Sequence, residues 1–167
     1  RSVSYALIKS LPKKTRIISG RNPVSLMKAL KNPAEIAATR RAHVKDGAAM
    51  VRFLCWLKQS VGAVDLTEVS AADYLERCRR AQEGCFDLSF PTIAGYGPNG
   101  AIVHYDPMLS GGSPLKAEGL LLVDSGGQYT DGTTDITRTI ALGPLTEEMK
   151  RHYTLVLRSH IALARAV

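Results

Sequence analysis

The sequence predicts an α+β fold in which helices back a curved antiparallel sheet. Three observations predict it. Helical periodicity dominates before Gly84, and short alternating runs with strong turn signals dominate from there to Leu142. Helical spacing then returns after Thr146. With 167 residues, 45% of them apolar, the chain can bury one ordinary core.

The residue pattern of the N-terminal segment predicts a short helix at Tyr5–Lys9 and a strand at Thr15–Ser19 that ends at Gly20. This segment starts in the middle of a pattern. We therefore interpret residues 1–22 as the tail of a preceding N-terminal domain and residues 23–167 as the main domain.

Two helices are predicted before the strands. Asn32 can cap the first one, Pro33 suits its first position, and Glu35 can reach back to the cap. Apolar residues then recur at helical spacing until Gly62. The second helix is predicted at 70–84, where a serine at the start and a glycine at the end mark its limits.

The following segment predicts strands at Thr92–Tyr96 and Ala101–Tyr105, joined in a hairpin by the turn residues Gly97–Gly100. Ser110–Pro114 reads as a loop, and Leu120–Val123 is an apolar run typical of a buried strand. The remaining predicted elements are two strands around the Gly126-Gly127 and Asp131-Gly132 breaks, ending near Leu142, and a helix that Thr146 caps.

The composition argues against several classes of protein. No apolar run reaches the roughly 18 residues of a membrane-spanning helix, and no signal peptide is visible, so we expect a soluble, cytoplasmic protein. The net charge of +7 is spread along helical stretches without a nucleic-acid motif, so we expect neither nucleic acid nor membrane as a partner. Cys55, Cys78 and Cys85 lack metal-site spacing and are expected to be small buried apolar residues.

Two aspartates carry the strongest chemical signal. Asp124 follows four apolar residues and Asp135 precedes an alternating strand pattern, so both are expected where strands are buried. A buried carboxylate needs a cation, a metal or several donors. The two residues are eleven positions apart with glycines between them, so the chain can reverse and bring both side chains to one point.

Such a pair of carboxylates suits Mn²⁺, Co²⁺, Mg²⁺ or Zn²⁺, and the spacing does not choose among these ions. The alternative interpretation is structural. In that case Asp124 and Asp131 serve turns, while Asp135 pairs with Arg138 or with a backbone donor.

The run Asp124–Thr139 resembles the first metal-binding signature of the Xaa-Pro aminopeptidase (aminopeptidase P) family, whose catalytic domain has the pita-bread fold. Phe90–Gly95 and Asn99–Tyr105 resemble the substrate-side strands of that family. Asn32–Ile36 resembles the opening of its catalytic-domain helix. The similarity covers roughly residues 23–167, which implies the first half of a pita-bread catalytic domain.

The resemblance assigns roles by position. Asp124 would serve one metal of a pair, and Asp135 would bridge both. His104 would hydrogen-bond the substrate or the developing tetrahedral intermediate, although a lone histidine at a strand end is commonly structural. Phe90 would line the pocket for the first side chain of the substrate. Arg138 would orient Asp135 from behind the metal.

The resemblance implies an enzyme that releases the N-terminal residue from peptides with proline in second position. It would use two divalent ions, with Mn²⁺ as the first expectation and Co²⁺ or Zn²⁺ as alternatives. A metal-bound water would attack the peptide bond. The family supplies a further histidine and two glutamates from sequence beyond the equivalent of Val167, and His152 and His160 are not expected to replace them. We therefore expect a truncated, inactive form that binds metal weakly or not at all.

A second hypothesis is a catalytically inactive pita-bread module that binds peptides or partner proteins. Under either hypothesis, half of such a domain would leave an apolar sheet face uncovered, so we expect a homo-oligomer.

Overall fold

A computed structural model describes residues 3–18 and 20–166, and the chain divides into two compact units at Asn32 and Pro33. The N-terminal unit holds helices α1 (Tyr5–Ser10) and α2 (Pro23–Ala29). Helix α1 confirms the prediction. Helix α2 was not predicted, although Asn22 caps it through the Val24 amide and a proline follows, the same signal that marks the next helix.

The predicted strand in this unit is wrong for Thr15–Ile18, and Ser19 lies outside the described residues. The Thr15 amide instead donates to the Pro12 carbonyl oxygen at 2.9 Å, which closes a turn. A strand needs a neighbour to satisfy its backbone groups, and the described part of this unit contains no other strand. The proposed domain limits at residues 22 and 23 stay a prediction.

The second unit begins with two helices, as predicted. Helix α3 spans Pro33–Ser60 and helix α4 spans Glu68–Arg80. Helix α4 starts two residues before the predicted Ser70. Its N-cap is Thr67, whose side chain accepts from the Ser70 amide while the Ser70 hydroxyl accepts from the Thr67 amide. Ser70 is therefore the N3 residue of the capping box and not its N-cap.

The strands form two three-stranded antiparallel sheets, ordered β1-β4-β5 and β2-β3-β6. The first sheet includes a strand, β1, that the sequence analysis did not predict. The bounds are β1 Cys85–Leu88, β2 Ile93–Tyr96, β3 Leu120–Ser125, β4 Gly127–Tyr129, β5 Gly132–Thr133 and β6 Ile136–Ala141; the other elements are the 3-10 helix η1 (Gly97–Ala101) and the helices α5 (Pro107–Ser110) and α6 (Glu147–Arg165).

The predicted hairpin is wrong. Strand β2 pairs with β3, and none of the residues 101–105, predicted to form the second strand, is in a strand: Ala101 ends η1, and residues 102–104 lie in a bend and turn. Gly95 and Gly100 account for the difference, because a side chain on Gly95 would lie only 2.8 Å from the backbone of Gly100. The chain thus folds directly back onto β2 instead of extending into a partner strand.

Strands β3 and β4 belong to different sheets although they are almost continuous in sequence. The break falls at Gly126, where an added Cβ would lie 2.0 Å from the Thr134 carbonyl oxygen. This close backbone approach requires glycine. It bends the segment that leads from Asp124 into the turn before Asp135.

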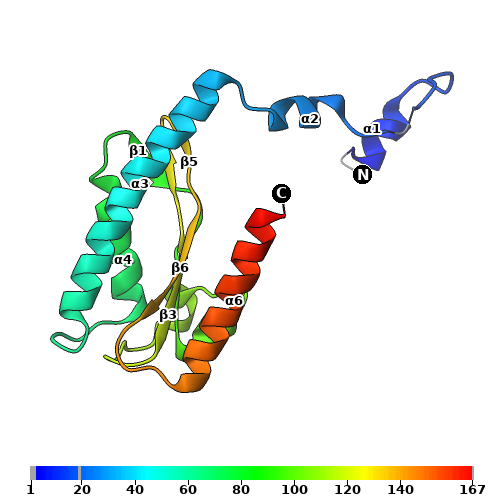
Figure 1. The fold of residues 1–167 in the computed structure, drawn as a ribbon. Coiled ribbons are helices and arrows are strands. Elements are labelled where there is room, and N and C mark those ends of the chain that lie inside the picture. Colours follow the sequence, from blue (N-terminus) through cyan, green and yellow to red (C-terminus); the bar gives the residue numbers. More distant parts are fainter. Residues whose placement is uncertain (1–2, 19, 167) are drawn as a thin grey trace. The chain divides into compact units, whose positions relative to one another are not determined.

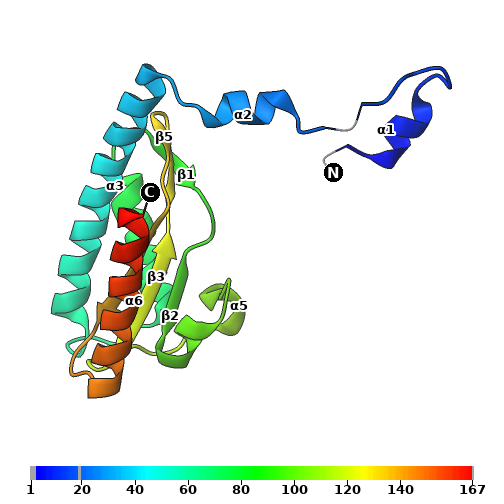
Figure 2. The ribbon, with the colours of Figure 1, turned by 45° about the vertical axis from the view of Figure 1, so that its right-hand side comes forward.

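Helices α3 and α4 pack side by side and cover one face of the sheets (Figures 1 and 2). Because side chains alternate along a strand, Leu121 and Val123 point from β3 into this helix-covered core. Fully buried partners from the helices include Phe53, Leu57 and Leu75. The α+β class and the antiparallel strands backed by helices are confirmed.

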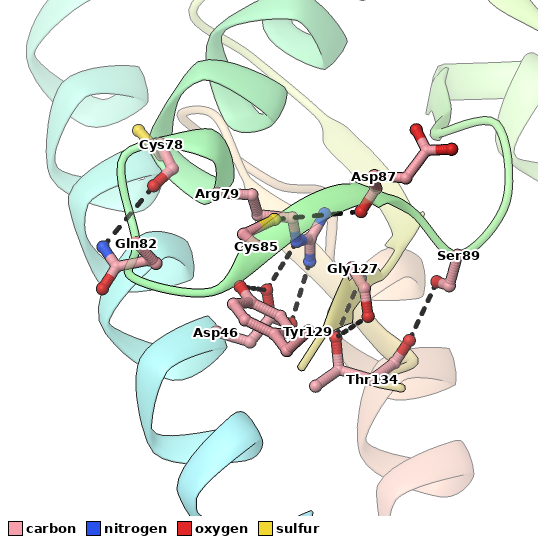
Figure 3. Close-up of polar contacts among 10 residues, drawn as sticks. All are labelled: Asp46, Cys78, Arg79, Gln82, Cys85, Asp87, Ser89, Gly127, Tyr129 and Thr134. Atoms are coloured by element: carbon pink, nitrogen blue, oxygen red, sulfur yellow. Dashed lines mark hydrogen bonds and ion pairs between the residues drawn. The ribbon is translucent and has the colours of Figure 1, made fainter. Parts of the chain in front are cut away.

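A buried ion pair ties the first sheet to both helices (Figure 3). Arg79 of α4 donates from Nε and Nη2 to the two carboxylate oxygens of Asp46 on α3, at 2.6 and 3.2 Å, and both side chains are inaccessible to solvent. The Tyr129 hydroxyl of β4 donates to the same Asp46 at 2.9 Å. Burial raises the pKa of Tyr129, and the bond to Asp46 raises it further. The pair therefore fixes three elements at one point.

Helix α6 begins after the capping residue Thr146, as predicted, and all its residues are exposed. They include apolar side chains such as Tyr153, Leu157 and Ile161. Within the described residues, no helix is long and apolar enough to cross a membrane.

The cysteine prediction holds only in part. Cys78 is buried, Cys85 is half-buried, and Cys55 is exposed. Cys55 lies on α3 and lines a shallow hollow between α3 and α4, together with residues such as Trp56 and Arg77.

Candidate metal site

Asp124 lies on the face of the β2-β3-β6 sheet opposite to the helix-covered core. It alternates with the buried Val123 and Ser125, and it is half-buried. Its cross-strand partner on β6 is Thr137, whose hydroxyl donates to Asp124 Oδ1 at 2.8 Å. This bond orients the carboxylate and leaves Oδ2 without a protein partner among the described residues.

Asp135 directly precedes β6 and lies two residues before Thr137, so strand alternation assigns it to the same face as Asp124. If the antiparallel ladder continued one residue further, the two aspartates would be diagonal neighbours, about 7–8 Å apart. The sequence prediction that the pair converges is compatible with this register. The expected burial is wrong, because Asp135 is exposed and Asp124 only half-buried. The apolar run Leu120–Val123 buries alternate residues only.

The structural alternative holds for Asp131 alone. Its carboxylate accepts from Arg41 at 3.0 Å and from Lys45 at 2.7 Å, and these bonds hold its pKa below the usual range. Asp131 thus anchors the β4–β5 turn to α3. Arg138 does not pair with Asp135 in the described structure. It donates instead to the Thr137 carbonyl oxygen at 2.7 Å, so its expected role toward Asp135 stays a prediction.

His104 is exposed and lies in a turn, not at the end of a strand as predicted. Its backbone has a φ of 57°, and it is the only non-glycine residue with positive φ among the described residues. This left-handed conformation costs energy for a residue with a Cβ and persists only where the surroundings enforce it. The next residue, Tyr105, is buried and supplies that anchor.

The segment that leads to His104 starts on the face that carries Asp124. A Cβ on Gly100 of η1 would lie 3.4 Å from the Leu122 Cβ, and Leu122 shares its sheet face with Asp124. Gly100 therefore lies on the same side of the sheet as Asp124, whereas Asn99 and Tyr105 contact Glu68 of α4. Phe90 is half-buried between β1 and β2, and its expected contact with substrate stays a prediction.

The donor set is small. Among residues 3–18 and 20–166, no cluster of three or more histidine, cysteine, aspartate or glutamate side chains is arranged to hold a metal ion. His152 and His160 lie on the exposed helix α6. Asp124 and Asp135 supply hard oxygen donors, which suit a divalent ion but do not complete its coordination.

Two residues that contact parts of the candidate site were not predicted from the sequence. Thr137 lies in the alternating run after Asp135, so strand pairing with the Asp124 segment could have indicated it. Glu68 is a fully buried acid that accepts a hydrogen bond from Tyr105, the residue after His104. No periodicity or motif in the sequence distinguishes Glu68 from a surface residue in a helical first turn.

Comparisons with known proteins agree with this fold. They define the chain as part of a metallopeptidase domain with the pita-bread fold. The model of metallopeptidase family M24 matches residues 37–167. The chain belongs to metallopeptidase family M24, and the resemblance to Xaa-Pro aminopeptidases is confirmed.

Similar sequences include the probable Xaa-Pro aminopeptidase P of Neurospora crassa, which is 42% identical over 166 residues. Aminopeptidase P1 of Lotus japonicus is 40% identical over 188 residues. The alignments cover 98% and 99% of this chain but only 24% and 28% of those proteins. The chain therefore spans about a quarter of the length of the relatives it matches.

Similar solved structures include the X-prolyl aminopeptidase of Caenorhabditis elegans, described as a cytosolic enzyme with a di-nuclear active site. It is 40% identical with a TM-score of 0.80, over 84% of this chain and 23% of that one. Zn-substituted aminopeptidase P of Escherichia coli, in complex with product, is 28% identical with a TM-score of 0.66, over 80% of this chain and 28% of that one.

Proposed function

We propose that this chain carries the first two metal ligands of an Xaa-Pro aminopeptidase, which releases the N-terminal residue from peptides with proline in second position. The observation that carries the proposal is the β3–β6 register, which pairs Asp124 with Thr137. By strand alternation, this register assigns Asp135 to the sheet face of Asp124. The di-nuclear site of the C. elegans relative supports two divalent ions. We propose Mn²⁺ as the metal, and the cytosol as the compartment.

A bound divalent pair would supply an activated water and stabilise developing negative charge. The residues of this chain have narrower tasks. Asp124, held through Oδ1 by Thr137, would present Oδ2 to one ion. Asp135 would lie between both ions, and His104 would donate to or accept from the bound peptide. Phe90 would contact the side chain of the first residue, and Arg138 would orient Asp135.

Titration of the chain with Mn²⁺ tests the ligand assignment through the selective broadening of NMR signals near Asp124. We expect weak binding, with a dissociation constant on the order of millimolar, as for other sparse oxygen sites. Asp124→Asn and Asp135→Asn should each reduce the broadening. Asp131→Asn is the matched control, because that carboxylate already pairs with Arg41 and Lys45.

Equal broadening in Asp135→Asn and the unaltered chain would refute the assignment. Hydrolysis provides a second test. Because two carboxylates do not complete a di-nuclear site, we expect the 167-residue chain with Mn²⁺ not to cleave an Xaa-Pro peptide. Cleavage that Asp135→Ala abolishes would show that ligands come from elsewhere, such as a second copy.

We also propose that the chain self-associates through α6 and the exposed sheet face. The apolar side chains of α6 have no cover in the described structure, and about 800 Å² per partner suffices for a specific interface. Light scattering at micromolar concentration should show species larger than 18.1 kDa. A folded species of 18.1 kDa alone would refute this proposal.

A further inference from the structure

Glu68 is the first residue of α4 and is completely buried, yet no cationic side chain among the described residues pairs with it. Its Oε1 accepts from the Tyr96 amide at 2.6 Å and from Asn99 Nδ2 at 2.9 Å. Its Oε2 accepts from the Tyr105 hydroxyl at 2.7 Å and from the Ser113 amide at 2.6 Å. Four neutral donors thus replace the water that burial removes.

These donors lie in or next to one excursion of the chain. Tyr96 precedes it, Ser113 follows it, and Asn99 and Tyr105 lie within it; this excursion, residues 97–112, is the His104 segment. Its helix α5 lies beside β2 (Figure 2). Glu68 therefore holds the entry, the middle and the exit of the segment with one carboxylate.

The contacts around Glu68 reinforce one another. Asn99 Nδ2 also lies 3.1 Å from the Tyr105 hydroxyl and 3.0 Å from Ser113 Oγ, and the Tyr105 hydroxyl lies 2.6 Å from Ser110 Oγ. The Glu68 amide donates to the Ser113 carbonyl oxygen at 3.0 Å. Such a network fixes the backbone on the C-terminal side of His104, where the left-handed conformation has to be maintained.

We propose that Glu68 is a positioning residue that holds His104 in its left-handed conformation, by anchoring Tyr105 and both ends of the His104 segment. The holding role stands on these contacts, and its importance for peptide binding rests on the function proposed above for His104. Glu68 itself does not touch the reacting groups. It acts at a distance through the segment it anchors.

Glutamine at position 68 tests this role because it cannot satisfy the site in either orientation. Each carboxylate oxygen accepts one backbone N–H, from Tyr96 on Oε1 and from Ser113 on Oε2. The NH₂ of a glutamine side chain would face one of these backbone N–H groups. Both groups are donors, so neither can accept a hydrogen bond from the other. Glu76→Gln is the matched control, since Glu76 lies on the same helix in a surface pair with Arg80.

Amide hydrogen exchange of the 167-residue chain, followed by NMR, separates a local role from a general one. In Glu68→Gln we expect the Tyr96 or Ser113 amide to exchange more than about tenfold faster, because bonds to a charged acceptor are lost. The His104 ring signals should move toward those of an unstructured histidine. The Leu121 amide in β3 and all amides in Glu76→Gln should keep their rates.

Equal acceleration of amide exchange at Leu121, Tyr96 and Ser113 would show that Glu68 only stabilises the whole fold, and it would overturn the proposal. Unchanged exchange rates at all amides would overturn it too. Tyr105→Phe covers the case in which Glu68→Gln does not fold, because it removes a single neutral donor. It should shift the His104 signals and leave the Tyr96 amide rate unchanged. Unmoved His104 signals would refute the proposal. Neither measurement uses metal or peptide, so failure of the proposed function would appear only in the Mn²⁺ titration.

Discussion

Asp46 and Glu68 are both fully buried carboxylates, yet the chain satisfies them in opposite ways. Asp46 meets the guanidinium of Arg79, and the bonds join α3, α4 and β4. Among the described residues Glu68 meets neutral donors only, and these lie in or next to a single chain excursion. The first arrangement fixes the scaffold, and the second fixes a loop on that scaffold.

The difference matters because a buried charge must be satisfied completely in either case. A cation offers strong attraction but leaves further hydrogen-bond needs, and Arg79 Nη1 indeed has no partner among the described residues. Neutral donors attract a carboxylate less strongly, but several of them can bind it at once, each from a fixed direction. Glu68 therefore determines the positions of several backbone groups, whereas Asp46 determines the spacing of helices.

The largest expected effect comes from breaking the ion pair. Arg79→Met should lower the free energy of unfolding by about 3–5 kcal/mol, because Asp46 is left buried without its cation. Urea denaturation followed by circular dichroism measures it. Arg80→Met is the control, since the ion pairs of Arg80 with Glu76 and Asp87 lie at the surface, and it should cost at most about 1 kcal/mol. Equal costs would mean that the buried pair does not stabilise the scaffold.

Acid should reveal a smaller effect at Glu68. Burial acts to raise the pKa of Glu68, but bonds from the Ser113 and Tyr96 amides and from Asn99 and Tyr105 lower it below its usual value. The unfolded chain therefore takes up the proton first as pH falls. The stability contributed by ionised Glu68 is complete above the ordinary glutamate pKa of about 4.3 and is lost as pH falls through the lower folded value.

The measurement is the difference in unfolding free energy between the unaltered chain and Glu68→Gln. It should be constant near neutral pH and shrink below about pH 4.3. The use of a difference removes contributions from other groups, including Asp131, whose pKa is also lowered. A difference that grows in acid would contradict the assigned sign.

The smallest effect concerns His104. A left-handed backbone costs a residue with a Cβ about 1–2 kcal/mol, and glycine removes this cost while adding flexibility to the unfolded chain. His104→Gly should therefore change the unfolding free energy by less than about 1 kcal/mol. His104→Val should destabilise more, because branched side chains tolerate this conformation poorly. Thermal unfolding compares the two variants.

Combining His104→Gly with Glu68→Gln sharpens the comparison of the two carboxylates. If Glu68 enforces the left-handed turn, the difference between His104→Gly and His104→Val should diminish when Glu68 is replaced. The same difference in an Arg79→Met background should persist. Persistence in both backgrounds would show that another contact maintains the turn.

The sequence predicted the long periodic elements well, because α3, β3 and α6 each carry a repeated apolar pattern or a cap that needs no tertiary information. It failed at residues 101–105, where Asn99-Gly100 gives a hairpin signal but the contact between Gly95 and Gly100 redirects the chain. A turn motif reports local preference, and this contact is not local.

The candidate site shows the same contrast between local and non-local signals. Asp124 and Asp135 could be proposed as metal ligands from the sequence because their motif is contiguous and the strands that carry it pair in register. Glu68 was not, since its donors lie between 28 and 45 residues away along the chain. Nothing in a helical first turn indicates that an acid is buried.

The exposure of Cys55 has a practical consequence for any study of the chain in solution. Burial raises the pKa of the Cys78 and Cys85 thiols, which keeps them protonated and slow to react. Cys55 is accessible, so an alkylating reagent or an electrophilic dye should modify it first. In air, two such chains can join through an intermolecular disulfide. Size-exclusion chromatography would then show a dimer that results from oxidation and not from a non-covalent interface. Samples for light scattering therefore need a reductant, and the same thiol offers a single attachment point for a fluorophore.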